Sequence, residues 1–188
     1  MSIESQVSDT VKKLSENRFE DAIVAVSVAF SATARLEYPN ASDKEAHHNF
    51  LNHNLPIISK IGWIAFGVSQ NINFKYRRLD KFNKGPEIST RTMPEMLYDV
   101  IRCTAAHEAK LPDNLQFTND PVIQLGTDGE LVLPIDLIYG LLMAVVASPK
   151  NTGRKIENNV NFNFNNKSVL VNELWGEHEK LKAFIGVK

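Results

Sequence analysis

The sequence predicts a mainly α-helical protein, a helical bundle with one or two small β-hairpins, built as a single domain over residues 1–188. Apolar residues recur at helical spacing through most of the chain, and two short stretches near its end have the pattern of hairpins. With 43% apolar residues, the chain has enough material for a hydrophobic core and does not have the composition of a disordered protein. Its 188 residues are a usual length for one domain.

The composition also excludes several classes of protein. A single cysteine excludes a disulfide scaffold and a multi-cysteine zinc site, and the net charge of −1 argues against a wholly basic nucleic-acid binder. No stretch approaches the ~18 unbroken apolar residues of a membrane span, and residues 1–15 lack the apolar middle of a secretory signal. We therefore expect a cytoplasmic protein with no membrane contact, no metal and no cofactor.

Helices are expected wherever apolar residues repeat every three or four positions. The stripe Ile3, Val7, Val11 and Leu14 is one such pattern, and the run that follows Phe19 is apolar almost all round, which indicates a buried helix. Pro56 is expected to interrupt the third helix. The expected helices span residues 3–14, 19–36, 43–54, 93–110, 135–147 and 173–184.

Two hairpins are predicted from turn residues. Thr127-Asp128-Gly129 separates two apolar runs within residues 122–133, with glycine where a positive φ is needed. The alternating stretch within residues 160–171 turns at Asn165-Asn166-Lys167. Between the helices, residues 69–91 are predicted to form a long exposed connection.

One motif near the end of the fourth helix suggests a function. Arg102 and His107 are separated by four residues, and here the sequence resembles the HEPN superfamily, whose helical proteins carry an arginine, four to six residues and then a histidine. The resemblance implies a bundle of HEPN type that forms homodimers and acts as a metal-independent RNA endonuclease in toxin–antitoxin or phage-defence systems. Cys103 stands where catalytic members usually have a polar residue, so a catalytically silent module that binds nucleotide, RNA or a protein partner such as an antitoxin is the alternative.

The two side chains suit RNA cleavage without metal. Histidine can transfer the proton of the attacking 2′-hydroxyl or of the leaving group, and arginine can stabilise the charge on phosphate with its fork of donors. Five residues at 100° each place Arg102 and His107 about 140° apart on an ideal helix, so two chains are expected to share one site. In the purely structural interpretation, Arg102 pairs with Asp99 at the surface.

A basic stretch with aromatic residues is the second candidate site. Lys75, Arg77 and Arg78 alternate with Phe74 and Tyr76, and cations beside rings are typical of single-stranded RNA binding. Alternatively, these residues form a surface loop whose aromatic rings pack into the core. No pair among His47, His48 and His53 has the i, i+4 spacing of two metal ligands on one helix, and we expect them on a solvated amphipathic helix. No motif supports an enzyme that acts on a small molecule.

Overall fold

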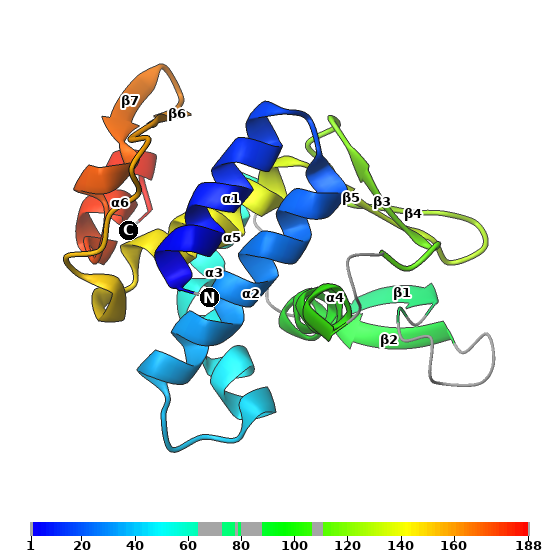
Figure 1. Ribbon diagram of the computed structural model, residues 1–188. Helices are drawn as coiled ribbons and strands as arrows, with labels where there is room; N and C mark the ends of the chain where they lie inside the picture. Colours follow the sequence, from blue (N-terminus) through cyan, green and yellow to red (C-terminus); the bar gives the residue numbers. More distant parts are fainter. Residues whose placement is uncertain (1, 64–72, 78, 80–87, 107–110, 188) are drawn as a thin grey trace.

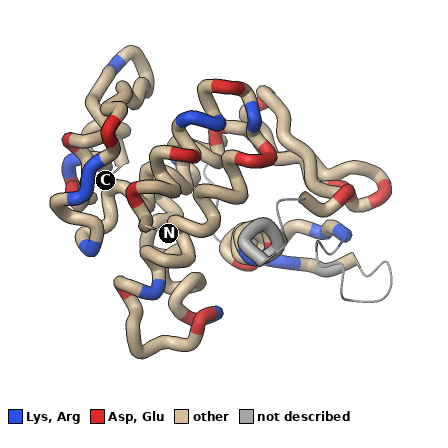
Figure 2. The backbone as a smooth tube through the Cα atoms, viewed as in Figure 1, with Lys and Arg blue, Asp and Glu red and all other residues tan. Residues whose placement is uncertain are grey.

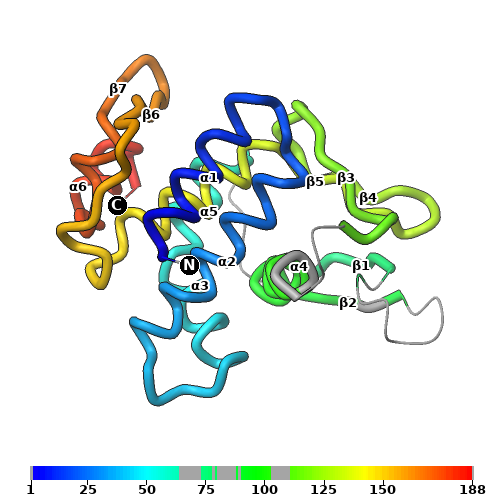
Figure 3. Tube along the Cα trace, viewed as in Figure 1, coloured from blue at the N-terminus to red at the C-terminus, as the bar shows by residue number. Residues whose placement is uncertain are grey.

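The computed structural model describes residues 2–63, 73–77, 79, 88–106 and 111–187, and it is mainly α-helical (Figure 1). The α-helices are α1 (Ile3–Ser15), α2 (Phe19–Glu37), α3 (Asp43–Gly62), α4 (Met93–Ala106), α5 (Asp136–Ala147) and α6 (His178–Ile185). The strands are β1 (Asn73–Arg77), β2 (Ile88–Thr92), β3 (Leu115–Thr118), β4 (Gln124–Leu125), β5 (Leu131–Pro134), β6 (Asn161–Phe164) and β7 (Lys167–Leu170). Helices α1 to α5 pack together, and the two groups of strands, β1–β5 and β6–β7, lie on opposite sides of them (Figures 1 and 3). None of the helices among these residues is both long and apolar enough to span a membrane.

Helix α5 lies at the centre of the core because its sequence is apolar almost all round. Ten of its residues are buried, from Leu137 to Ala147, with Tyr139 only partly covered. Helix α3 packs against α5 very closely. A Cβ placed on Gly140 would lie 2.7 Å from the carbonyl oxygen of Ile58, so only glycine fits at this crossing.

Helix α2 is also buried on most sides, as the sequence predicts. Its apolar face includes Ile23, Val26 and Phe30, none of which is accessible to solvent. It packs against α1, α3, α4 and α5. Its buried polar groups therefore need partners within the protein, either in the same helix or on neighbouring elements.

The prediction that Pro56 interrupts the third helix is wrong. Helix α3 continues through Pro56 to Gly62. Proline removes one backbone N–H and clashes with the preceding turn, which costs about 3 kcal/mol or more in a helix interior. Pro56 itself is exposed, whereas Ile57 and Ile58 beside it are buried, and we attribute the continuity of the helix to that burial.

Both predicted hairpins are present. Strands β4 and β5 pair antiparallel around a turn in which Gly129 has a φ of 79°, and β6 and β7 pair around Asn165 and Asn166, which both have positive φ. The sequence pattern missed β3, which pairs with β5 in parallel. A parallel partner leaves no local signal because it is distant in sequence.

The predicted connection over residues 69–91 is partly wrong, since β1 and β2 form an antiparallel hairpin within it and at its end. Tyr76 anchors β1 because its ring is fully buried, and the backbone N–H of Arg77 donates to the carbonyl of Gly129, 2.8 Å away. Charged residues are frequent in this stretch, so the sequence pattern did not indicate a strand.

The last helix starts later than predicted. Gly176 has a φ of 80°, and its N–H donates to the carbonyl of Val146 at the end of α5, 2.9 Å away. This turn fixes the chain before α6, which therefore begins at His178. Helix α4 is described as far as Ala106, and the remainder of the predicted helix to residue 110 lies outside the described residues.

We expect Gly140→Ala to destabilise the protein by about 1–3 kcal/mol, because the added methyl group has to push α5 away from the backbone of α3. In a helix without such crowding, alanine is more favourable than glycine by about 1 kcal/mol. A loss of stability in Gly140→Ala would therefore report the close contact between the two helices. Urea unfolding measures it. An unchanged or higher midpoint would contradict the close helix crossing.

Candidate functional site

The structure places Arg102 on the exposed side of α4. The opposite side of this helix is buried at Met93, Leu97, Val100 and Ile101. Arg102 is therefore not needed for packing and is accessible to a ligand. His107, the second residue of the predicted motif, lies outside the described residues.

Arg102 has a different neighbour from the one expected in the purely structural interpretation. It lies near Tyr98, one turn earlier, and its charge opposes the rise in pKa that burial causes at the Tyr98 hydroxyl. Asp99 instead accepts a hydrogen bond from the hydroxyl of Tyr76 at 2.8 Å and lies 3.5 Å from Nε of Arg91. The carboxylate of Asp99 thus holds the β1–β2 hairpin against α4.

A cavity of about 420 Å³ lies between α2, α3 and α4, and Arg102 is part of its wall. Its lining residues are Ser31, Ala32, Arg35, Asp43, His47, Tyr98 and Arg102. The two arginines outnumber the single carboxylate, so the wall carries one excess positive charge when His47 is neutral. A cavity of this size and charge suits a small anion or one anionic group of a larger ligand.

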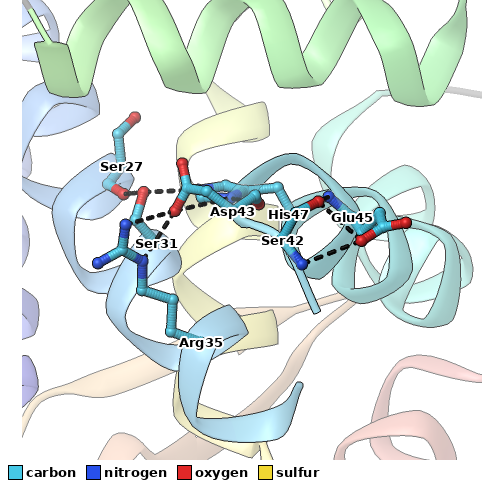
Figure 4. A network of polar contacts seen from close by, with 7 residues as sticks. All are labelled: Ser27, Ser31, Arg35, Ser42, Asp43, Glu45 and His47. Carbon is cyan, nitrogen blue, oxygen red and sulfur yellow. Dashed lines mark hydrogen bonds and ion pairs between the residues drawn. The ribbon is translucent and has the colours of Figure 1, made fainter. Parts of the chain in front are cut away.

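His47 connects α3 to α2 through both of its ring nitrogens (Figure 4). Its Nδ1 lies 2.6 Å from the backbone carbonyl oxygen of Asp43, and its Nε2 lies 2.9 Å from Oγ of Ser31. The Ser31 Oγ in turn lies 2.8 Å from the carbonyl oxygen of Ser27. Only 4% of His47 is exposed, so the expectation that it is solvated is wrong.

Asp43 and Arg35 form an ion pair next to the His47–Ser31 contact (Figure 4). Nη2 and Nε of Arg35 lie 2.6 and 2.8 Å from the same carboxylate oxygen of Asp43. Asp43 is the first residue of α3 and lies between Ser42 and Glu45, which form a capping box. Both charged side chains are more than half exposed, so the pair contributes little to stability and its arginine remains accessible.

Aromatic contacts surround the other side of the cavity. The ring of Tyr98 lies 4.8 Å from that of His48 and 5.7 Å from that of His47, between ring centroids. Burial raises the pKa of the Tyr98 hydroxyl, while the charge of Arg102 opposes this shift. Tyr98 therefore remains a neutral phenol at physiological pH.

The predicted RNA-binding stretch is only partly available to a ligand. Lys75 is exposed on β1, whereas Nη2 of Arg77 donates to the backbone carbonyl of Asp128, 2.8 Å away. Arg78 lies outside the described residues. Tyr76 is buried, so its ring does not form a stacking platform, which agrees with the surface-loop alternative for this residue. Figure 2 shows the basic residues of β1 and β2 along this hairpin.

Two further histidines, His53 and His178, are not part of the cavity wall. His53 is exposed and stacks on His178 of α6, with 5.0 Å between ring centroids. Within the described ranges, no group of three or more His, Cys, Asp and Glu residues could hold a metal ion.

Sequence reasoning missed the polar side of α2. Ser27, Ser31 and Arg35 follow one another at intervals of four residues and therefore lie on one face of an otherwise apolar helix. Asp43 and His47 have the same spacing on α3. This repeated spacing was the available signal, but it does not show that the two faces meet.

We expect acid to weaken the contribution of His48 to stability. Burial lowers the pKa of His48 below its ordinary value of 6.5, and the nearby charge of Lys44 adds to this shift. The unfolded chain then binds the proton at a higher pH than the folded chain does. The contribution is therefore complete above pH 6.5 and is lost as the pH falls through the folded-state pKa.

The measurement is urea unfolding of wild type and of His48→Gln at several pH values between about 8 and 5. The difference in unfolding free energy between the two proteins should move in favour of the variant as the pH falls. A constant difference, or one that moves in favour of the wild type, would contradict the burial of a neutral imidazole against Tyr98.

Comparison with known proteins gives a family for this chain. No curated protein and no solved structure matches the chain. A family model with the description Rv1289 matches residues 2–188, which include every element of the fold and the whole wall of the cavity. The chain therefore belongs to the Rv1289 family.

Proposed function

We propose that the protein is a metal-independent RNA endonuclease of HEPN type and that Arg102 binds the phosphate at which the chain is cut. The observation that carries this proposal is the position of Arg102. It is exposed, it is not used in packing, and it lines a cavity together with a second arginine, Arg35. A phosphodiester has one negative charge, which matches the single excess positive charge of the wall.

The cleavage step requires three groups. The 2′-hydroxyl of the RNA loses its proton and attacks the adjacent phosphorus, the 5′-oxygen leaves with a proton, and a cation stabilises the charged intermediate. The guanidinium of Arg102 supplies the cation. We assign one of the proton transfers to His107, in agreement with the spacing of the sequence motif.

A homodimer completes this proposed site. An ideal helix would separate Arg102 from His107 by about 140° within one chain, so we propose that His107 of one chain acts with Arg102 of the other. Lys75, Arg77 and Arg78 would extend the contact along single-stranded RNA. In a toxin or phage-defence system of the cytoplasm, an antitoxin or another protein partner would restrain the activity.

The alternative is a catalytically silent module of the same type. Arg102 would then bind a nucleotide, RNA or an acidic group of a protein partner without cutting it. The same cavity supports this function, because binding needs the positive charge but no proton transfer.

We expect wild-type protein to cut single-stranded RNA in excess EDTA and to leave 2′,3′-cyclic phosphate ends. Arg102→Ala should lower the rate by about 10²–10³-fold, and Arg102→Lys should restore it only in part because a point charge lacks the planar fork. His107→Ala should lower it by about 10²–10⁴-fold. Analysis of the cut ends and initial rates measures these effects.

Arg18→Ala is the matched control, because Arg18 is an exposed arginine paired with Glu16 and Asp21 at the start of α2, away from the cavity wall. All variants must first show the melting temperature of the wild type. RNA that binds but is not cut would favour the silent module. Cutting that persists in folded His107→Ala would disprove the assigned proton transfer.

Mixing the two inactive variants tests the shared site. Arg102→Ala and His107→Ala subunits would form mixed dimers, each with one complete pair of residues. If subunits exchange at random, about a quarter of the wild-type rate should return, since half of the dimers are mixed and each keeps one of two sites. No recovery after verified subunit exchange would place both residues of a site in one chain.

A further inference from the structure

The contact between Ser31 and His47 has a consequence that does not depend on RNA. The carbonyl oxygen of Asp43 can only accept a hydrogen bond, so Nδ1 of His47, 2.6 Å away, carries a proton. In the neutral ring, Nε2 then has no proton and can only accept. Its neighbour at 2.9 Å is Oγ of Ser31, whose hydroxyl can donate either to this nitrogen or to the carbonyl oxygen of Ser27, 2.8 Å away.

The second neighbour of Ser31 fits the charged state of the histidine. When His47 is protonated, Nε2 donates to Oγ, and the serine hydroxyl turns to the carbonyl oxygen of Ser27, 2.8 Å away. The proton between the two residues can therefore be on Oγ of Ser31 or on Nε2 of His47. The carboxylate of Asp43 lies 4.0 Å from Nδ1, beside the backbone carbonyl oxygen that contacts the same nitrogen.

This is the arrangement of a serine nucleophile. A hydroxyl lies within hydrogen-bond reach of a base, and a third group fixes the orientation and the tautomer of that base. Ser31 is only partly buried, and both Ser31 and His47 line the cavity. A substrate in the cavity would therefore reach the hydroxyl.

The wall of the cavity also defines the class of substrate. Arg35 lies one turn after Ser31 on the same face of α2, and Arg102 lines the cavity from α4. Their positive charges suit an anionic group on the substrate and the negative charge that develops on a carbonyl oxygen under attack. The volume of about 420 Å³ is that of a small-molecule site.

We propose that Ser31 is a nucleophile, activated by His47, that hydrolyses small carboxylic esters bearing a carboxylate or phosphate group. This activity is separate from RNA cleavage, because its nucleophile is a protein hydroxyl and it needs neither His107 nor RNA.

The reaction has two balanced steps. Oγ of Ser31 bonds to the carbonyl carbon, its proton passes to Nε2 of His47, and that proton then goes to the leaving alcohol oxygen as the carbon–oxygen bond breaks. The product is an acyl ester on Ser31 and a free alcohol. Water then gives a proton to Nε2 and attacks the acyl carbon, which releases the carboxylic acid and returns the proton to Ser31.

Two probes of the full-length protein test the proposal. Hydrolysis of 4-nitrophenyl hydrogen succinate should give a burst of about one 4-nitrophenolate per chain, as expected for an accumulating acyl-enzyme. A fluorophosphonate should add one phosphonyl group per chain, and peptide mass spectrometry should place it on Ser31. Ser31→Ala should lose both the burst and the adduct.

The controls separate catalysis from folding. Ser15→Ala should keep the burst, because the Ser15 hydroxyl also donates to a helix carbonyl, Lys12 at 2.7 Å, but Ser15 is not part of this cavity. His47→Gln, which retains hydrogen-bonding groups but no base, should lower the burst rate by about 10²–10⁴-fold. Each variant is compared with the wild type by melting temperature and near-ultraviolet circular dichroism.

A measurement without substrate completes the test. In ¹⁵N-histidine spectra at pH 8, the neutral ring of His47 should carry its proton on Nδ1. The proposal is overturned if the proton is on Nε2, if the wild type shows neither burst nor adduct, or if folded Ser31→Ala keeps either one. These outcomes are independent of the RNA assay, so a failure of RNA cleavage and a failure of ester hydrolysis are distinguishable.

Discussion

The burial of α5 is the constraint on which the rest of the structure depends. A helix that is apolar almost all round has to be enclosed, and α2 and α3 both pack against it. The close crossing at Gly140 holds α3 through the backbone of Ile58, even though Pro56 lies next to this contact. Because α3 is held at this end, its first turns, which carry Asp43 and His47, meet the polar face of α2.

The candidate site exists because α2 is not apolar on every side. Ser31 lies in a helix that packs against four others, and its hydroxyl requires partners within the protein. His47 supplies one of them and is itself fixed by the carbonyl of Asp43. The hydrogen bonds that satisfy these polar groups also fix their side chains in the wall of the cavity.

The positive charge of the cavity comes from two elements distant in sequence. Arg35 is held by an exposed ion pair with Asp43, and Arg102 lies near the buried Tyr98. Neither arginine contributes to the core. The proposed RNA chemistry uses Arg102 as a phosphate ligand, and the proposed ester chemistry uses both arginines with Ser31. The two proposals share the anion preference of one cavity but differ in nucleophile.

The sequence by itself determined most of the helices and both predicted hairpins, because apolar spacing and turn residues such as Gly129 and Asn165 act locally. It also identified Arg102 as a candidate site residue. It could not show that β3 pairs in parallel with β5, that α3 continues through Pro56, or that His47 is buried. Only the tertiary structure decided these points, because each depends on contacts between segments far apart in the chain. The cavity is the clearest case, since Ser31, His47 and Arg102 come from three helices and meet only where α2, α3 and α4 pack against one another.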